Sequence, residues 1–287
     1  MSDDEQDMDD LDPALLIEEA AAAQEAGEET VAARIYNAAG NVYMSVAEFE
    51  EALDCFEKSL SLYKKLKDET GISDTTYNLG VAQINLERWT EAVITCQKAM
   101  DLFQKLGNKD GAADAMYGVA LASLGQGDFD KAMDFFKKAQ RAYKTVENEQ
   151  GVAVTLVDIG NAYQDQQNTE EAEKTFRKAL KIYRDLDDNA GIADVLSLLG
   201  EIAETQGNVR KAAECFVEAA QCYLNAEILD ISREVIDRAE QMMWDVPKGT
   251  RRRLRPAIDD IRDALPEEDE MEDEDFDEDL LELDDVE

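Results

Sequence analysis

Histidine is missing from this sequence, and cysteine is rare, with only Cys55, Cys96, Cys215 and Cys222 among 287 residues. The lack of histidine excludes zinc sites of the Cys/His kind and the Ser-His and Cys-His arrangements of hydrolases. The cysteines show no CxxC spacing and are too few for a disulfide framework, so we predict buried free thiols. No phosphate loop, calcium loop or dinucleotide fingerprint is present. We therefore expect a protein that is not an enzyme and that binds no metal and no cofactor.

Long apolar runs are also missing. No stretch approaches the roughly 18 apolar residues that span a bilayer, and the start Met-Ser-Asp-Asp-Glu has no basic or apolar signal region. We therefore expect a cytoplasmic protein with no membrane segment. Proline is limited to 4 residues and glycine to 15, while charged residues make up 33% and apolar residues 44%. This balance favours long helices around a real core.

A period of forty residues runs through the chain. Small, alanine and mainly aromatic positions, with Cys96 as the exception, recur in register over five copies without an insertion, and a further glycine recurs four times. The columns are Gly40, Gly80, Ala120, Gly160 and Gly200; Ala52, Ala92, Ala132, Ala172 and Ala212; Phe56, Cys96, Phe136, Phe176 and Phe216; Tyr63, Phe103, Tyr143, Tyr183 and Tyr223; and Gly71, Gly111, Gly151 and Gly191. The small column predicts close helix approach, and the last column is interpreted as marking the breaks between copies.

Each copy predicts a helical hairpin, because apolar residues recur at helical spacing on both sides of a short turn. The first helices, termed A, are expected near 31–46, 72–87, 112–127, 152–167 and 192–207. The second helices, termed B, take most of the remainder. One hairpin cannot cover its own apolar face, so neighbouring hairpins must stack into a continuous core.

The pattern resembles the tetratricopeptide repeat family, which places Leu-Gly, an aromatic, Ala, Phe and Ala at fixed offsets. The matching residues are Tyr43, Leu79, Gly80, Ala92, Phe136, Tyr163 and Ala179. The family repeat has 34 residues. The period of forty resembles the long-repeat branch of kinesin light chains and Leu-Gly-Asn polarity scaffolds, with the extra residues late in helix B or in the loop after it. The resemblance covers residues 29–227 and implies an all-α, right-handed superhelical solenoid of five hairpins.

The predicted organisation follows from these repeats and from the segments that flank them. We expect an acidic disordered tail over 1–11 and a capping helix over 12–27 that starts at Asp12-Pro13. The five repeats are expected over 28–67, 68–107, 108–147, 148–187 and 188–227. Capping helices are expected over 228–265, the first with Met243 and Trp244 among its apolar residues and a short one near 254–264. A basic run lies at 248–255, and a second acidic disordered tail covers 266–287.

Charge is distributed unevenly along the chain. The net charge is −38, and residues 1–12 hold seven acids and residues 267–287 fifteen, with no base in either segment. Blocks of like charge repel themselves, which favours disorder. In the five predicted A windows one base, Arg34, stands against eight acids, while most bases fall on B helices.

The resemblance implies that the A helices line a concave groove, which the charges then make neutral to acidic. The carboxylate clamp known in this family needs several Lys or Arg residues in the groove, and only Arg34 is present. Amides, phenols and carboxylates could instead bind the main chain, apolar groups and bases of an extended peptide. The candidate residues are Asn37, Asn41, Asp74, Tyr77, Asn78, Asn85, Asp114, Tyr117, Asp158 and Asn161. The alternative is a solvated face with tyrosines packed between helices.

The acidic C-terminal segment also contains apolar residues that predict a docking motif, namely Phe276, Leu280 and Leu281. Its host is a basic outer face of this chain or another protein, and the sequence leaves both open. The basic run at 248–255 either pairs with acidic segments of the chain or is a solvated helix start. Nucleic-acid binding is not expected, because the whole chain is strongly acidic.

These features predict a non-enzymatic scaffold that binds a protein or peptide with basic or mixed segments. The alternative is an acidic chaperone for a basic client protein, and a third interpretation treats the acidity as adaptation to high salt. The sequence does not specify the partner, the organism or the oligomeric state.

Overall fold

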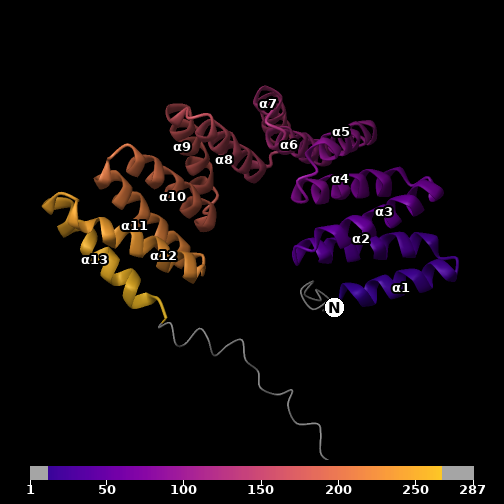
Figure 1. Ribbon diagram of the computed structural model, residues 1–287, viewed down its shortest axis with the longest axis horizontal. Helices are drawn as coiled ribbons and strands as arrows, with labels where there is room; N and C mark the ends of the chain where they lie inside the picture. Colours follow the sequence, from indigo (N-terminus) through magenta and orange to yellow (C-terminus); the bar gives the residue numbers. More distant parts are fainter. Residues whose placement is uncertain (1–11, 267–287) are drawn as a thin grey trace, which may run out of the picture. The chain divides into compact units, whose positions relative to one another are not determined.

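The computed structural model describes residues 12–266, and every regular element in this range is a helix (Figure 1). The all-α fold class predicted from the sequence is therefore confirmed. The predicted N-terminal tail and the docking motif Phe276, Leu280 and Leu281 lie outside the described residues. The chain divides into two compact units, which meet in the sequence between Asp165 and Gln166.

Within residues 12–266, unit 1 contains eight helices, and unit 2 contains five α-helices and one short 3-10 helix. Those of unit 1 are α1 (Pro13–Glu25), α2 (Glu29–Ser45), α3 (Phe49–Leu66), α4 (Glu69–Asn85), α5 (Trp89–Leu106), α6 (Lys109–Gly125), α7 (Phe129–Thr145) and α8 (Glu149–Asp165). Those of unit 2 are α9 (Thr169–Asp185), α10 (Asn189–Thr205), α11 (Val209–Asn225), α12 (Leu229–Gln241), η2 (Met242–Trp244) and α13 (Lys248–Ala264). In each unit, consecutive helices pack against one another as antiparallel neighbours (Figure 1).

Successive helices begin twenty residues apart, from Glu29 of α2 to Leu229 of α12. At each junction from Gly27 to Glu227, again at steps of twenty, one residue has a positive φ and ends the preceding helix. This residue lies two positions before the next helix, so the loops are very short. The residues beyond a 34-residue repeat therefore lengthen the helices themselves.

The glycine column from Gly71 to Gly191 does not mark breaks, contrary to the sequence interpretation. Gly71 is the third residue of α4, and its N–H donates to the Oδ1 atom of Asp68, the N-cap residue, at 3.0 Å. Equivalent caps start α6, α8 and α10, so these helices and α4 begin three residues earlier than expected. Helix α2, which has no side-chain cap, begins two residues earlier than expected. Gly71 is required by packing, since a Cβ on it would lie 2.4 Å from Cδ1 of Tyr63.

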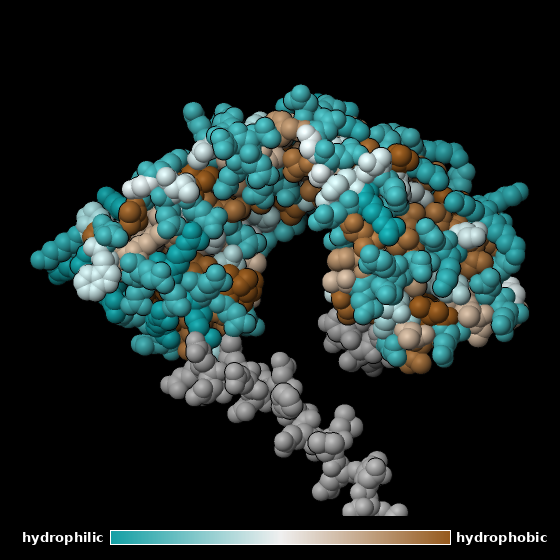
Figure 2. Space-filling view, in the orientation of Figure 1, coloured by the Kyte–Doolittle hydropathy of each residue, from teal (hydrophilic) through white to brown (hydrophobic). Residues whose placement is uncertain are grey.

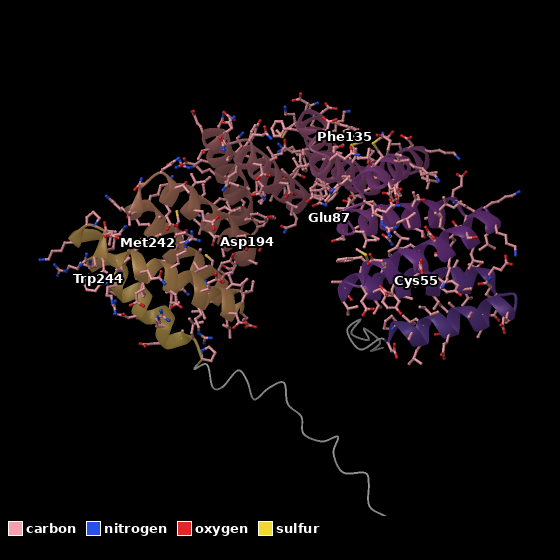
Figure 3. The ribbon with its side chains drawn as sticks, in the orientation of Figure 1. Cys55, Glu87, Phe135, Asp194, Met242 and Trp244 are labelled. Carbon is pink, nitrogen blue, oxygen red and sulfur yellow. The ribbon has the colours of Figure 1, made fainter. Side chains whose placement is uncertain are left out.

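The surface of both units is largely hydrophilic, with hydrophobic residues in small patches on the visible face (Figure 2). The cysteines are free thiols: Cys55 and Cys96 are buried, and Cys215 and Cys222 are half-buried. Cys55 lies among the helices of unit 1 (Figure 3). Along the described residues no helix is both long and apolar enough to cross a membrane.

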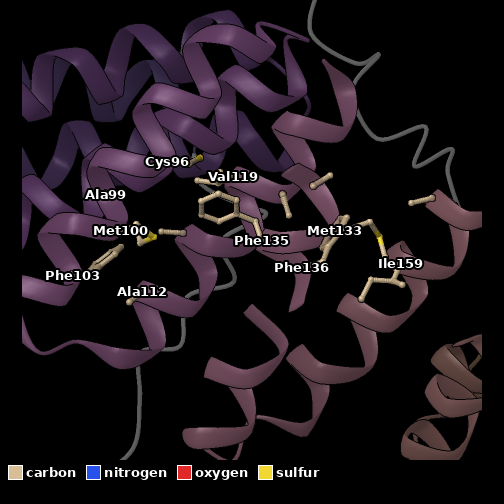
Figure 4. Packing of buried hydrophobic residues seen from close by; sticks show 14 residues of the cluster. Cys96, Ala99, Met100, Phe103, Ala112, Val119, Met133, Phe135, Phe136 and Ile159 are labelled. Carbon is tan, nitrogen blue, oxygen red and sulfur yellow. The ribbon is translucent and has the colours of Figure 1, made fainter. Parts of the chain in front are cut away.

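The core follows the aromatic columns of the sequence. Phe56, Phe136, Phe176 and Phe216 are among the largest fully buried side chains. A Cβ on Gly40 would approach Phe56 to 2.5 Å, so the small column permits this close contact, as predicted. In unit 1, Phe136 packs in a cluster with Cys96, Val119 and Ile159 (Figure 4).

The C-terminal helices differ from the sequence prediction in two respects. Helix α13 starts at Lys248 rather than near residue 254, so the basic run forms its first half. Trp244 is 83% exposed instead of being part of an apolar capping face. The chain turns into a 3-10 helix at Met242, which rotates Trp244 away from the core that Met242 and Met243 enter.

Candidate functional site

The candidate groove residues lie on the A helices of unit 1, which are α2, α4, α6 and α8. Within each helix they are separated by three, four or seven residues, apart from the adjacent pair Tyr77 and Asn78, so they project largely from one side. We call this surface, made by the ten predicted residues Asn37, Asn41, Asp74, Tyr77, Asn78, Asn85, Asp114, Tyr117, Asp158 and Asn161, the A face. Hydrogen bonds between α2 and α4 and between α6 and α8 show that neighbouring A helices lie side by side.

Three of the predicted asparagines form one network. The Nδ2 atom of Asn78 donates to Oδ1 of Asn37 at 3.3 Å and to Oδ1 of Asn41 at 3.2 Å. The hydroxyl of Thr75 donates to the same Asn37 oxygen at 3.3 Å. Thr75 was not predicted, although its position three residues before Asn78 places it on the same side of α4. All three asparagines are half-buried, so each keeps some contact with solvent.

Two predicted aspartates accept hydrogen bonds from tyrosines. The hydroxyl of Tyr143 donates to Asp114 Oδ1 at 2.8 Å, and that of Tyr117 donates to Asp158 Oδ2 at 2.5 Å. Burial raises the pKa of both carboxyl groups above the ordinary value, and the tyrosine hydrogen bonds oppose this shift. These carboxylates are thus partly satisfied within the protein. Tyr143 was assigned only to packing, although the 29-residue separation recurs between Asp194 and Tyr223, whose hydroxyl donates at 2.6 Å.

The remaining predicted residues are less tied to one another. Asp74 is exposed, and Phe103 stands where Tyr143 stands in the next repeat, so Asp74 lacks the equivalent of the hydrogen bond that Asp114 accepts from Tyr143. Partial desolvation raises the pKa of Asp74. Tyr77 is half-buried, with its ring edge-on to Phe103 at 6.3 Å between centroids.

The other two asparagines of the A face, Asn85 and Asn161, take no part in the network of Asn37, Asn41 and Asn78. Asn85 is exposed and donates to the carbonyl of Val81 at 2.9 Å. Asn161 is half-buried and has no hydrogen-bond partner within the described residues.

A cavity of about 560 Å³ opens beside the asparagine network, where α1, α2 and α3 meet. Asn37 and Asn41 line it together with Arg34, Glu19 and Tyr63. Arg34 is exposed and has no ion pair among residues 12–266. The cavity therefore offers one free guanidinium and two amides, which is less cationic than a carboxylate clamp requires.

The charges of unit 1 separate by helix type. The four A helices carry eight acids against two bases, Arg34 and Lys109. The three B helices α3, α5 and α7 carry ten bases against eight acids. No group of three or more Asp, Glu or Cys residues positioned for a metal ion occurs in the described part of the chain. The A face is therefore a polar surface of amides, phenols and carboxylates.

Solved structures share this fold at low sequence identity. BtubC (BKLC) from P. vanneervenii has a TM-score of 0.62 at 17% identity, and the match covers 75% of this chain and 89% of that one. A putative kinesin light chain with nearly identical repeats from Podosopora anserina has a TM-score of 0.55 at 14% identity, covering 67% and 95%. The Rap conjugation gene regulator of the plasmid pLS20, with a TM-score of 0.58 at 16% identity, covers 86% and 80%.

Curated protein sequences give no significant match. Family models do match. One tetratricopeptide repeat model matches residues 71–145 and 151–225, and a second matches residues 33–66. The first alone covers more than half of the chain, and its matches follow the forty-residue period of buried aromatic and small residues. The chain therefore belongs to the tetratricopeptide repeat family.

Proposed function

We propose that the chain is a non-enzymatic cytoplasmic scaffold that binds an extended segment of a partner protein along the A face of unit 1. The observation that carries the proposal is the cluster of Asn37, Asn41 and Asn78 beside the cavity, on helices with eight acids and two bases. The partner is expected to carry basic or mixed segments.

The asparagine cluster suits the main chain of an extended peptide. Each amide group both donates and accepts, as each peptide unit does. The bonds from Asn78, at 3.2 and 3.3 Å, are at the long end of the usual range. A peptide that offers better geometry can replace them without leaving a buried group unpaired, so the exchange loses little energy.

Recognition of basic side chains falls mainly to Asp74. Asp114 and Asp158 already accept hydrogen bonds from Tyr143 and Tyr117. Asp74 is exposed and lacks a tyrosine partner at the position of Tyr143, so it can pair with Lys or Arg of a partner. Tyr77 lies three residues after Asp74 on α4, so its ring adds aromatic surface near that carboxylate.

Related structures support a peptide ligand. The Rap conjugation regulator that shares this fold was solved in complex with the Phr* peptide. Repeat folds of this kind present extended binding surfaces, because each repeat contacts only its neighbours and leaves one side free.

The test is affinity purification with the full chain as bait, followed by mass spectrometry, and then measurement of Kd for the partner obtained. Replacing Asn37, Asn41 and Asn78 by Ala together removes about three hydrogen bonds and is expected to weaken binding roughly tenfold or more. The matched control is Asn225→Ala on α11, whose side chain bonds only to Gln221 of its own helix. Equal affinity of the triple variant and the control would reject the A face as the site.

The second candidate is an acidic chaperone for a basic client, favoured by the fifteen acids and no base of residues 267–287. In that case, removing residues 267–287 lowers affinity steeply at low salt, because screening weakens the attraction at high salt. The A face variant then leaves binding unchanged, which separates the two candidates.

A further inference from the structure

A second concave surface lies in unit 2, apart from the A face. An open cavity of about 830 Å³ is lined by residues of η2, the end of α12 and the first half of α13. Met243 and Trp244 supply its apolar surface, and Lys248, Arg251, Arg252 and Arg255 supply its charge. We call it the C-terminal pocket. Its one acidic lining residue is Glu240.

Trp244 gives this pocket an open aromatic surface. Its side chain is 83% exposed, more than any other large hydrophobic residue between positions 12 and 266. It lies at the outer edge of the unit, where η2 leads into α13 (Figure 3). Arg251 packs over the ring at 5.8 Å from the centroid and donates from Nη2 to the Trp244 carbonyl at 2.8 Å. An exposed aromatic group held in place in this way is typical of a docking surface.

The bases that line the C-terminal pocket favour an anionic ligand. Arg255 is paired with Glu240 and Asp259, both at 2.9 Å, but Lys248 and Arg252 have no ion pair among the described residues. Helix α13 has no acid in its first turn and no side-chain cap. Its bases therefore crowd the positive end of the helix dipole, an arrangement that an added anion relieves.

The acidic segment 267–287 of the same chain matches this surface in both charge and apolarity. It holds fifteen acids and no base, and Phe276, Leu280 and Leu281 interrupt the acids. Aromatic and leucine side chains are chemically suited to an apolar surface such as that of Trp244 and Met243, and carboxylates are suited to the bases Lys248 and Arg252. A nucleic acid offers the anion without the aliphatic groups, and the net charge of −38 repels it.

The segment is long enough to reach the pocket. Helix α13 rises 1.5 Å per residue, so Arg252 lies about 18 Å back along the helix from Ala264. The ten residues from Pro266 to Phe276 span up to about 33 Å when extended. Asp259, Asp260 and Asp263 make the second half of α13 acidic, so the basic first half is the part of this helix that suits an acidic segment.

We propose that residues 267–287 fold back onto the C-terminal pocket of their own chain, with Phe276, Leu280 and Leu281 against Trp244 and Met243. Tethering keeps the segment at an effective concentration of roughly millimolar, so even a weak contact is occupied. The proposal involves unit 2 alone and stands independently of the function proposed for the A face.

The experiment measures acrylamide quenching of Trp244 in the full chain, with Trp89 replaced by Phe so that one tryptophan remains. The expected result is that the unaltered segment shields Trp244. The variant F276A/L280A/L281A, which retains all fifteen acids, then raises the quenching constant toward that of a free indole. Raising NaCl from about 0.1 to 1 M shortens the Debye length from ~10 to ~3 Å and is expected to act in the same direction.

A charge exchange in the pocket gives an independent measurement. Arg252→Glu is expected to expose Trp244, whereas Lys178→Glu, on an exposed site of α9 without an ion pair in the described chain, is expected to leave quenching unchanged. The proposal is overturned if quenching is identical in the unaltered chain, in F276A/L280A/L281A and in Arg252→Glu. Shielding that grows with protein concentration overturns it too, since the segment of a second copy is then the occupant. Shielding that requires added DNA overturns it in favour of nucleic acid.

Discussion

The hydroxyl of Tyr143 donates to Asp114 across 2.8 Å and so joins helix α7 to helix α6. The same bond recurs 80 residues later, between Tyr223 and Asp194. In the second repeat the aspartate is present as Asp74, but Phe103 replaces the tyrosine. The repeats therefore contain a natural comparison of the fold with and without this hydrogen bond.

Tyr143→Phe is expected to destabilise the protein by about 1.5–3 kcal/mol, because it removes a bond to a charged, half-buried group. Phe103→Tyr adds the corresponding bond to Asp74 and is expected to stabilise by about 0.5–1.5 kcal/mol. Urea unfolding measures both. Tyr43→Phe is the control, since the Tyr43 hydroxyl has no hydrogen bond within the described residues. Equal losses for Tyr143→Phe and Tyr43→Phe would contradict the prediction.

An exchange between alanine and glycine is expected to change the free energy of unfolding in opposite directions at a left-handed helix end and inside a helix. Ala47 has a φ of 59° and Gly107, at the equivalent place, has a φ of 73°. Ala47→Gly relieves the strain of a Cβ in this conformation and is expected to stabilise by about 0.5–1 kcal/mol. Gly107→Ala is expected to destabilise by about 1 kcal/mol. Ala38→Gly, within helix α2, supplies the contrast, because glycine lowers stability there.

A clash between neighbouring hairpins is expected from Gly71→Ala. The added Cβ would lie 2.4 Å from Cδ1 of Tyr63, so the two helices must separate, at about 1–3 kcal/mol. Gly249→Ala in α13 meets no atom within 4 Å and is expected to be neutral or slightly stabilising. Thermal unfolding of the two variants checks this, and similar Tm values would show that α4 has room for a side chain.

Mild acid is expected to stabilise the fold. Desolvation raises the pKa values of Asp74, Asp114 and Asp158 above 3.8, so the folded state takes up protons at higher pH than the unfolded chain. Stability is therefore gained as pH falls through their folded pKa values, and the gain is complete below 3.8.

Glu173 acts in the opposite sense, at lower pH. A hydrogen bond from Lys211 holds its pKa below 4.5, so its contribution is present above that pH and is lost as the pH falls through its folded pKa. Tm measured from about pH 7 to pH 3 should pass through a maximum, and Asp114→Asn should reduce the rise. A steady decline of Tm from neutrality would contradict the assignment.

Much of the fold is predictable because packing repeats in the sequence. Phe56 and Phe136 recur with the small residues Gly40 and Ala120, and this column identified both the core and the close approach of the helices. Gly71 was misinterpreted because a glycine forced by a ring contact and a glycine in a loop look alike in a sequence. The N-cap Asp68, three residues earlier, was the better signal for the helix start.

The candidate site was less predictable than the fold. Helical periodicity placed Asn37, Asn41 and Asn78 on one side, and the structure joins them. Helical periodicity does not specify that Asp114 accepts a hydrogen bond from Tyr143, since that bond depends on how adjacent helices cross. Trp244 was counted among the apolar residues of the capping helix because helical spacing was extended past Met242, where a tighter 3-10 turn changes the direction of the side chains.

The positive-φ residue at every twentieth position has a consequence for how such a chain changes in length. Cutting out residues 68–107 would join Lys67 directly to Asn108, and the new junction would again have a left-handed residue followed by an N-cap. Every junction between consecutive helices from Gly27 to Glu227 has such a left-handed residue, so one junction can replace another. Gene duplication or deletion in units of forty residues therefore lengthens or shortens the array without requiring a new turn to evolve.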